Sequence, residues 1–422
     1  MVRIRVAQVI NHEIGLRVHG RNYFSYLRDQ GYDLQVVCSP GELVQGDMVT
    51  DEGIVVKAIS LPSRYTPVDD LKALIQLVRH FRQQRYDIVH THTVKPGFLG
   101  RIAARLAGTP IVIHTVHGFH YWDDMSDMEN RFFVWLERFA ARFCDSILSQ
   151  NREDIEFAVR ERICSPEKIR FLGNGIDITR FRPDAVSPDV AVAKRRELGV
   201  APDETLVGMI GRLVRLKGYF EYMQAARLLH ERGERIKFLA IGAAQDKASA
   251  VSPPELIAQH GLQDSMQFLG MRDDIPELMA AMDVVVLASY AEGIPRVLLE
   301  TAAMGKPAVG TDVRGTREVI VDGKTGYLVP PRDASALADA ISRLSSAPAQ
   351  RRKMGKAARR RAEVHFDERF YFWRTDHEYR RLAEAKMPSG RLQGLKDLSL
   401  EAKRLLVCSG EEKNEVQQMR SV

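Results

Sequence analysis

The chain repeats one pattern, in which a short apolar run precedes a segment whose apolar positions recur at helical spacing. The clearest run, Asp-Val-Val-Val-Leu-Ala, occupies residues 283–288, and a helix is predicted after it over 295–304. Such runs are typical of parallel strands covered by helices on both faces. Further strands are predicted at residues 3–10, 33–39, 53–60, 86–93, 110–118, 205–211, 236–242 and 266–270. Further helices are predicted at residues 16–30, 68–84 and 129–143, after residues 95–97 as far as residue 107, and within residues 333–385. The pattern predicts an α/β fold with doubly wound sheets.

The length of 422 residues exceeds one ordinary core and suits two domains of about 150–200 residues each. A stretch rich in proline, alanine and charge at residues 184–203 indicates the connection. We therefore expect a first domain over residues 1–183 and a second over 184–367. Residues 387–422 form a tail, either disordered or containing one amphipathic helix with Leu392, Leu395, Leu398, Ala402, Leu405 and Leu406 on its apolar face.

Composition narrows the setting in which the protein acts. No run of 18 or more apolar residues occurs, and the first residues predict a strand rather than a signal peptide, so a cytoplasmic protein is expected. The four cysteines are far apart and form no Cys-x-x-Cys pair, which argues against a disulfide framework and a thiolate zinc site.

The net charge of +6 admits three classes of partner: nucleic acid, an anionic membrane surface, or an anionic small substrate. Nucleic acid ranks last, because no recognised binding motif accompanies the charge. The segment 129–143 combines Phe132, Trp135 and Phe139 with basic residues. This aromatic stripe is either core or a face for anionic lipid, and periodicity does not separate the two interpretations.

The turn Glu292-Gly293-Ile294 lies between a predicted buried strand and a helix that starts at Pro295 and stops at Gly305. Open α/β sheets bind ligands at such turns, because helix N–H groups and the positive end of the helix dipole point there. Glu292 could instead be a first-turn acid, and Glu300 could pair with Arg296 on a solvated face. Two carboxylates in an otherwise apolar segment favour the binding site.

A second strand-to-helix turn contains Gly211, Arg212, Lys217 and Gly218. Two cations and two glycines suit a diphosphate, because the backbone can approach it closely; a solvated basic loop is the alternative. The corresponding turn after the first strand, residues 11–15, lacks Gly-x-Gly-x-x-Gly, so no dinucleotide cofactor is expected.

Five histidines, His90, His92, His114, His117 and His120, lie in or after two neighbouring predicted strands. They raise the question of a zinc site. No acidic or thiolate partner lies nearby in the sequence, so we expect no metal.

The spacing from Glu292 to Glu300 resembles the Glu-x7-Glu signature of retaining glycosyltransferases of family 4. His117-Gly118, Asn174-Gly175-Ile176-Asp177 and Gly211-Arg212…Lys217-Gly218 match further family elements, in order, and the resemblance covers about residues 3–385. It implies the GT-B fold, two Rossmann-like doubly wound domains that face across a cleft, with a helix over 368–386 that crosses back to the first domain. The setting Thr-Val-His-Gly-Phe at 115–119 is similar to the branch that builds bacterial surface polysaccharides.

The resemblance also implies a role for each matching residue. His117 and Glu292 orient the donor sugar, Arg212 and Lys217 hold the diphosphate, and Glu300 binds the ribose. Arg272 lies in the turn that meets the nucleoside base. The expected donor-binding set is Gly15, Gly211, Arg212, Lys217, Arg272, Glu292, Gly293, Ile294, Pro295, Arg296, Val297 and Glu300, and the expected catalytic set is His117, Glu292, Arg212 and Lys217.

The function implied by the resemblance is a retaining hexosyl- or N-acetylhexosaminyl-transferase that needs no cofactor and no metal. A UDP-sugar is the expected donor, and a glycan or polyprenyl-linked molecule the expected acceptor. An anionic membrane surface is a further expected partner, with the protein peripheral at the inner face of the plasma membrane, whereas nucleic acid is not. The alternative is a GT-B protein that binds sugar nucleotides without transfer, or a GT-B epimerase or phosphorylase.

Overall fold

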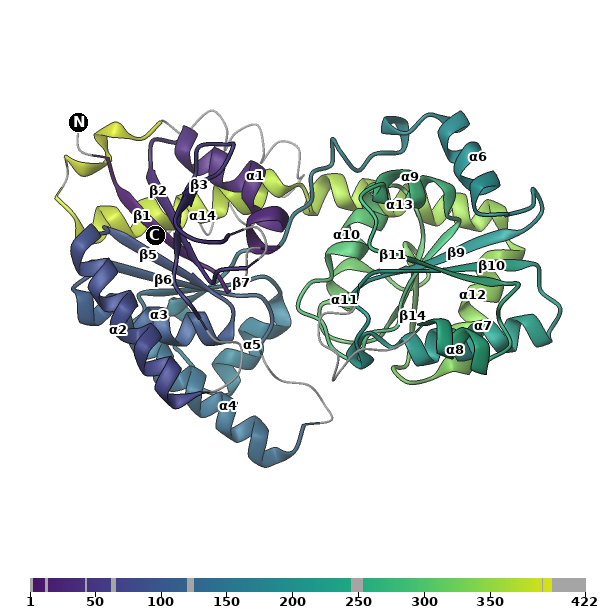
Figure 1. The fold of residues 1–422 in the computed structure, drawn as a ribbon, viewed down its shortest axis with the longest axis horizontal. Coiled ribbons are helices and arrows are strands. Elements are labelled where there is room, and N and C mark those ends of the chain that lie inside the picture. The colour runs from purple at the N-terminus through teal and green to yellow at the C-terminus, as the bar shows by residue number, and fades with distance from the viewer. Residues whose placement is uncertain are drawn as a thin grey trace. The chain divides into compact units, whose positions relative to one another are not determined.

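The computed structural model describes residues 3–11, 14–41, 44–61, 66–119, 125–243, 253–388 and 390–396, with only the backbone for 14–21 and 253–254. The chain divides into two compact units (Figure 1). Residues up to Gly173, together with those from Arg369 onwards, form the first unit, and Asn174–Glu368 form the second.

The first unit is built on one sheet with the strand order β3-β4-β2-β1-β5-β6-β7-β8. All neighbouring strands are parallel apart from the antiparallel pair of β3 and β4. The strands are β1 (Arg5–Val9), β2 (Asp33–Cys38), β3 (Met48–Val49), β4 (Val55–Ala58), β5 (Ile88–His92), β6 (Ile111–Val116), β7 (Ser146–Ser149) and β8 (Ile169–Phe171). The helices are α1 (Ile14–Asp29), α2 (Pro67–Gln84), α3 (Val94–Ala107), α4 (Asp127–Ala140), α5 (Arg152–Arg160) and α14 (Glu368–Lys386).

Alternate residues of these strands enter two separate cores, one on each face of the sheet. Ile88 packs with side chains of α1 and α14, whereas its neighbour Val89 packs with α2, α3 and α5. Helices therefore cover both faces (Figure 1), as the apolar runs predicted.

The second unit contains an all-parallel sheet with the order β11-β10-β9-β12-β13-β14. Its strands are β9 (Thr205–Ile210), β10 (Ile236–Ile241), β11 (Met266–Gly270), β12 (Val284–Leu287), β13 (Ala308–Thr311) and β14 (Gly326–Val329). Its helices are α6 (Pro188–Glu197), α7 (Tyr219–Glu231), α8 (Pro253–Gln259), α9 (Ile275–Ala281), α10 (Arg296–Ala303), α11 (Thr316–Val319), α12 (Ala334–Ser346) and α13 (Pro348–His365). Successive strands run outward from β9 to one edge and then from β12 to the other, so the winding reverses between β9 and β12. The predicted doubly wound fold is confirmed.

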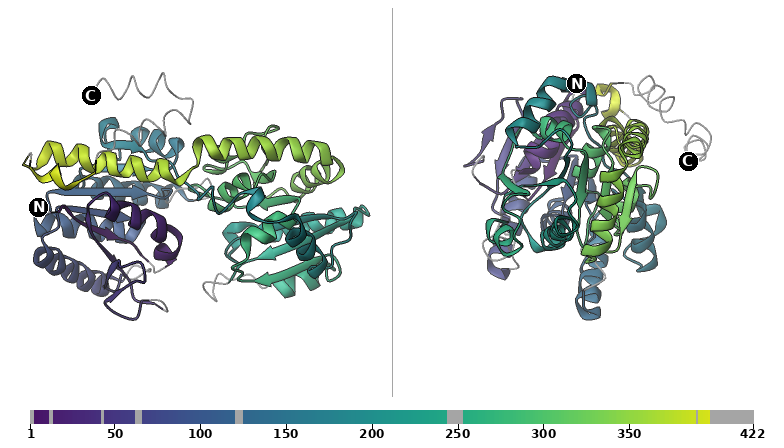
Figure 2. Two further views of the ribbon diagram at one scale, coloured as in Figure 1. Left: turned by 90° about the horizontal axis from the view of Figure 1, so that it is seen from above. Right: turned by 90° about the vertical axis from the view of Figure 1, so that its right-hand side faces the viewer.

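Helix α14 lies against the first unit, although it follows the second unit in the sequence (Figure 2). Its Asp376 accepts a 2.5 Å hydrogen bond from the hydroxyl of Tyr32 and pairs with Arg380 at 3.0 and 3.1 Å. Tyr379 is fully buried in the core beneath it. These contacts fix the position of α14 on the first unit.

Several details differ from the sequence analysis. Residues 174–183 pack with the second unit, because Ile176 pairs with Asp367 and Phe181 enters the core around α10. Residues 184–203 contain helix α6, which lacks a strong apolar stripe but has a Ser187 cap and Pro188 in its first turn. The short strand β7 was not predicted, because two of its four residues are serines.

The tail begins differently from the expected amphipathic helix. Residues Arg391–Gly394 form a single 3₁₀ turn, and Leu392 and Leu395 pack on the core of the first unit. The amide of Lys396 donates to the carbonyl of Gln30 at 3.1 Å. Leu398, Ala402, Leu405 and Leu406 lie outside the described residues.

Two glycines fix the backbone between β12 and α10. Gly218, at the start of α7, has φ +74°, and a Cβ there would lie 2.0 Å from the carbonyl oxygen of Ala288. Gly315, at the start of α11, has φ +78°, and a Cβ would lie 1.7 Å from the oxygen of Gly293. Neither position has space for a side chain, so the turns after β9 and β13 hold the 288–293 segment between them.

Replacing Gly218 with alanine tests this contact against a matched control. Gly233 has the same φ of +74°, but no atom lies within 4 Å of its Cβ position. We expect Gly233→Ala to lower the free energy of unfolding by about 1 kcal/mol, the cost of a left-handed backbone. Gly218→Ala should lower it by about 1–3 kcal/mol more, since the new methyl group overlaps the carbonyl. Urea denaturation of both variants measures the difference, and equal losses would contradict the close approach.

Candidate functional site

The second unit brings a lysine and a glutamate together where its winding reverses. Lys217 follows β9, Glu292 follows β12, and the Lys217 Nζ lies 2.5 Å from Glu292 Oε1. Only 16% of the lysine side chain and 11% of the glutamate side chain are exposed. Open α/β sheets bind ligands at the carboxyl ends of the strands beside such a reversal. This pair is the centre of the candidate site.

Hydrogen bonds fix the turn that carries Lys217. Gly211 donates its amide to Ile241 at 2.9 Å and accepts a 2.8 Å hydrogen bond from the hydroxyl of Tyr219. Because Gly211 has no side chain, the aliphatic part of Lys217 packs close to it. The Cδ of Lys217 lies 3.8 Å from the position that a Cβ of residue 211 would occupy. Arg212, next in the chain, is exposed. The turn thus holds one half-buried cation and one exposed cation at the same edge of the sheet.

The segment that carries Glu292 is anchored on the other side. The amide of Tyr290 donates to Leu216 at 2.9 Å, and its hydroxyl donates to Glu221 at 2.6 Å. The guanidinium of Arg332 lies 4.7 Å from the centre of the Tyr290 ring. Tyr290, Glu221 and Arg332 were missed in the sequence, because no local pattern links residues so far apart.

Helix α10 starts one residue later than expected. Pro295 is its N-cap, with ψ 112°, and not its first helical residue. The side chain of Ile294 is buried in the core, and Val297 packs partly against it. Ile294 can therefore offer a ligand only backbone atoms, and the amides at the helix N-terminus, which have no intrahelical acceptor, lie next to it.

On α10, Glu300 does not form the surface ion pair with Arg296 that was the alternative interpretation. Among the described residues its carboxylate makes no hydrogen bond, and no ion pair joins it to Arg296, whose side chain instead approaches the carbonyl of Gly175 at 3.5 Å. Burial raises the pKa of Glu300, and the charges of Arg296 and Arg180 oppose this rise. The carboxylate is thus a half-buried acceptor available to a polar ligand.

Arg272 lies just after β11 and is already engaged. Its Nε and Nη2 donate to the two oxygens of Asp274 at 2.7 and 2.6 Å, and Lys194 reaches the same carboxylate at 2.9 Å. The hydrogen bonds from Arg272 hold the pKa of Asp274 well below its usual range. Any contact of this turn with a base would therefore come from its backbone.

His117, after β6 in the first unit, belongs to a buried polar cluster. His117 Nε2 lies 3.1 Å from Nδ1 of His92, whose Nε2 lies 2.7 Å from the oxygen of Gln8. Burial lowers the pKa of His117 to about 4, against a smaller opposing effect of Gln150. The ring is therefore neutral near pH 7. Gln8 was overlooked, although one polar residue in an apolar strand is a visible signal.

His90, His92 and His117 lie together, whereas His114 does not join them. His114 lies on the opposite face of the sheet from His90, bonded to Thr91 at 3.0 Å. In the described part of the chain, no group of three or more His, Cys, Asp or Glu residues could hold a metal ion. His120 lies outside the described residues.

Gly15 lies within α1, which begins at Ile14, and not in the loop where it was expected. The side chains around it are not among those described. Its expected role in donor binding stays a prediction.

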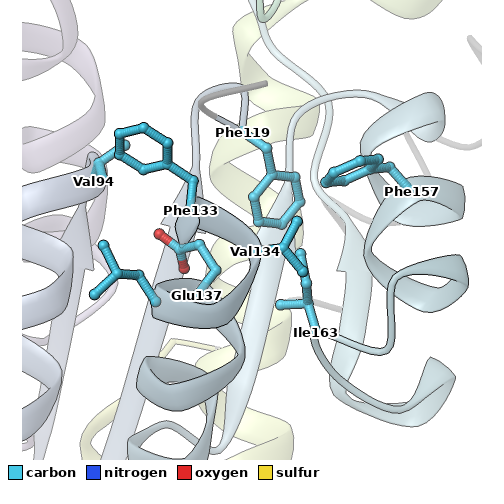
Figure 3. Close-up of a pocket in the computed structure, with 8 residues that line it drawn as sticks. Val94, Phe119, Phe133, Val134, Glu137, Phe157 and Ile163 are labelled. Carbon is cyan, nitrogen blue, oxygen red and sulfur yellow. The ribbon is translucent and has the colours of Figure 1, made fainter. Parts of the chain in front are cut away.

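Helix α4 resolves the aromatic stripe into two faces. Phe133, Val134 and Glu137 turn inward and line a pocket with Val94, Phe119, Phe157 and other apolar side chains (Figure 3). Glu137 is paired with the fully buried Arg101 at 2.9 Å, so the pocket wall is apolar apart from a neutralised carboxylate. On the outer face, 79% of Met128, 52% of Phe132 and 56% of Trp135 are exposed.

Family models and related proteins match both units of the chain. Residues 15–175 match the family model described as Glycosyl transferase 4-like domain, and residues 192–361 match Glycosyl transferases group 1. The UDP-Gal:alpha-D-GlcNAc-diphosphoundecaprenol alpha-1,3-galactosyltransferase of Escherichia coli is 30% identical over 326 residues, 76% of this chain and 82% of that relative. The putative glycosyltransferase EpsD of Bacillus subtilis is 32% identical over 81% of this chain and 87% of its own length.

Solved structures support the same fold. HepE of Anabaena, crystallised with UDP-glucose, has a TM-score of 0.75 and 22% identity, covering 90% of this chain and all of that one. WaaG, a glycosyltransferase involved in lipopolysaccharide biosynthesis, has a TM-score of 0.70 and 17% identity over 88% of this chain and 99% of its own. Of the helices that the structure describes, none is long and apolar enough to cross a membrane. The family models on both units, the relative at this identity and the shared architecture together show that the chain belongs to the family 4 glycosyltransferases and has their GT-B fold.

Proposed function

We propose that this glycosyltransferase is a retaining enzyme that moves a sugar from a UDP-sugar to a glycan or polyprenyl-linked acceptor in the synthesis of a bacterial surface polysaccharide. The observation that carries the proposal is the Lys217–Glu292 pair at the reversal of the second sheet, beside the N-terminus of α10. The donor and acceptor classes are supported by the names of two similar proteins, one a galactosyltransferase from UDP-Gal to a diphosphoundecaprenol-linked sugar and one crystallised with UDP-glucose.

In this reaction the departing diphosphate is the group whose developing charge most needs stabilisation. When the bond from the sugar to the diphosphate breaks, negative charge develops on the phosphate oxygens. Lys217, Arg212 and the amides at the start of α10 supply positive charge without a metal ion. Because Glu292 holds Lys217 at 2.5 Å, the cation is placed before the donor arrives.

Other residues of the site bind the ribose, the base and the sugar of the donor. Glu300, half-buried and without an ion-pair partner among the described residues, suits the ribose hydroxyls. The backbone of the turn at Arg272 suits the base. Glu292 and His117 orient the sugar.

The acceptor side is proposed to lie at an anionic membrane surface. Met128, Phe132 and Trp135 expose apolar surface on one helix, and Arg131 and Arg142 are exposed beside them. Aromatic and basic side chains together are typical of helices that lie on anionic lipid. A polyprenyl-linked acceptor would be presented to the enzyme from such a surface.

A screen of nucleotide sugars for thermal stabilisation and turnover tests the donor assignment, and two variants test the diphosphate site. We expect Arg212→Ala and Lys217→Ala each to lower the transfer rate by about 10²–10³, because each removes a cation from the developing charge. Lys353→Ala, an exposed lysine on α13, is the control and should leave the rate unchanged. Near-normal turnover in both site variants would refute the assignment, and donor binding without transfer in the wild type would favour a binding protein.

A donor with 2′-deoxyribose separates the roles of the two carboxylates. Wild type should bind it more weakly than the ribose donor by about 1–3 kcal/mol, the cost of a lost partner at a polar site. Glu300→Gln should raise the donor KM and discriminate little between the two donors, whereas Glu292→Gln should lower kcat and keep the discrimination. Glu231→Gln, an exposed carboxylate on α7, serves as the control. Equal discrimination in wild type and Glu300→Gln would show that Glu300 does not touch the ribose.

Sedimentation with vesicles that contain phosphatidylglycerol tests the membrane surface. We expect binding at low salt that weakens as salt is added, because the attraction is partly electrostatic. Replacing Phe132 and Trp135 with serine should abolish most binding, whereas Phe220→Ser, which removes a ring that is 48% exposed on α7, should not. Vesicle binding unaffected by the α4 changes would place the contact elsewhere.

A further inference from the structure

The edge of the second sheet that holds Lys217 carries a glycine at three neighbouring strand ends. Gly211 follows β9, Gly242 follows β10, and Gly270 is the last residue of β11. Their amides continue the sheet, because Gly211 donates to Ile241 and Gly242 donates to Gly270, each at 2.9 Å. Among the described residues, no atom lies within 4 Å of the position that a Cβ of Gly270 would occupy. These three residues therefore place no side chain along the edge between Lys217 and the turn after β11.

The turn after β11, residues 271–274, lies at the far end of this edge. Neighbouring strands are about 4.8 Å apart, so the end of β11 is about 10 Å from the end of β9. In the turn, 74% of Met271 is exposed. The proposed function puts the diphosphate of the donor beside Lys217, and an edge of this length leads the attached nucleoside to the turn.

Asp274 ends the turn and begins α9, but its carboxylate does not cap that helix. An aspartate at this N-cap position normally accepts a hydrogen bond from a backbone amide in the first turn of the helix. The side chain of Asp274 makes no such bond. Its oxygens instead accept from Nε and Nη2 of Arg272, and Lys194 donates to one of them at 2.9 Å. The carboxylate thus holds the turn rather than the helix.

Lys194 reaches the turn from α6. Its Nζ also lies 2.7 Å from Glu197, and Nη2 of Arg272 lies 3.7 Å from the same carboxylate, so two cations and two carboxylates alternate. Only 14% of the Lys194 side chain and 26% of the Asp274 side chain are exposed, so salt screens this pair less than a fully exposed one. Arg272 and Asp274 belong to the same turn, and their bond shapes it, whereas Lys194 ties the turn to α6.

Helix α6 is itself fixed to the second unit. It packs against α9 (Figure 1), and Leu198, directly after it, shares a core with Leu278 of α9. Arg195, next to Lys194, donates to the carboxylate of Asp283 at 2.9 Å. A side chain on this helix can therefore hold the turn in one place.

We propose that Lys194 is a positioning residue for the donor nucleotide, which holds the turn 271–274, through Asp274, in the place where the backbone of the turn binds the base. The binding of the base rests on the proposed transferase function, whereas the effect of Lys194 on the turn does not. Lys194 acts without touching the donor. The stretch 184–203, which the sequence indicated only as a connection, thereby contributes to recognition of the nucleotide.

Amide hydrogen exchange of the full chain without ligand tests the effect on the turn. Lys194→Met removes the ammonium group at similar length, whereas Lys194→Arg keeps a cationic donor. We expect Lys194→Met to speed exchange about tenfold in peptides that cover residues 270–275, and Lys194→Arg to restore most of the protection. Arg196→Met, which removes an exposed cation of the same helix, is the matched control and should change nothing there. Unchanged exchange in Lys194→Met would overturn the proposal.

Calorimetric titration with UDP and with inorganic pyrophosphate separates the base from the diphosphate. We expect Lys194→Met to weaken UDP binding about tenfold, the equivalent of one hydrogen bond to a charged group, and to leave pyrophosphate binding unchanged, because only UDP reaches the turn. Lys194→Arg should restore most of the UDP affinity. An equal loss for both ligands, or no loss for UDP, would refute the positioning of the base.

A double-mutant cycle tests whether Lys194 acts through Asp274. Asp274→Asn should weaken UDP binding by itself, and Lys194→Met should then add little, because its partner is already lost. Additive losses would refute the route through Asp274. Failure of the wild type to bind UDP would refute the proposed donor and the positioning of its base, whereas the exchange experiment decides the tie between Lys194 and the turn by itself.

Discussion

A parallel sheet must be covered on both faces, and in the second unit of this chain that requirement decides where polar side chains can lie. The faces of β9 and β12 are occupied by apolar contacts with helices. Only the strand ends remain, and the backbone amides there point outward beside the helix N-termini. Where the winding reverses, two neighbouring strand ends belong to distant parts of the sequence. Lys217 and Glu292, 75 residues apart, meet at 2.5 Å for this reason.

The backbone at that point is set by main-chain packing more than by side chains. Gly218 and Gly315 come so close to the carbonyls of Ala288 and Gly293 that neither could carry a Cβ. Each turn is held by its neighbour, so an ion pair built on two of them keeps its geometry. This close approach explains why both turns that contact the two ends of the 288–293 segment have a glycine at the contact.

The strands and the two carboxylates could be predicted, because they depend on local pattern. The run from residue 284 to 288, directly after Asp283, has no polar residue, and a segment of that kind is typical of a buried strand. By contrast, β7 is four residues long with two serines, and α6 lacks a continuous apolar stripe. Both form because of their surroundings in the folded chain. Lys194 lies 80 residues from Asp274, and no spacing rule connects them.

The two glutamates of the signature, one in the turn before α10 and one on the helix, have opposite electrostatic surroundings. Glu292 has a lysine at 2.5 Å, which stabilises its charge. Glu300 has no such partner among the described residues, and burial raises its pKa, with only Arg296 and Arg180 in opposition. A carboxylate held by a cation can place that cation for another anion, whereas an unpaired, half-buried carboxylate gains most from neutral hydroxyl donors, which satisfy its oxygens without adding charge. The eight-residue spacing thus puts Glu292 in the turn before α10 and Glu300 within the helix, and the difference between their surroundings comes from their neighbours rather than from their own chemistry.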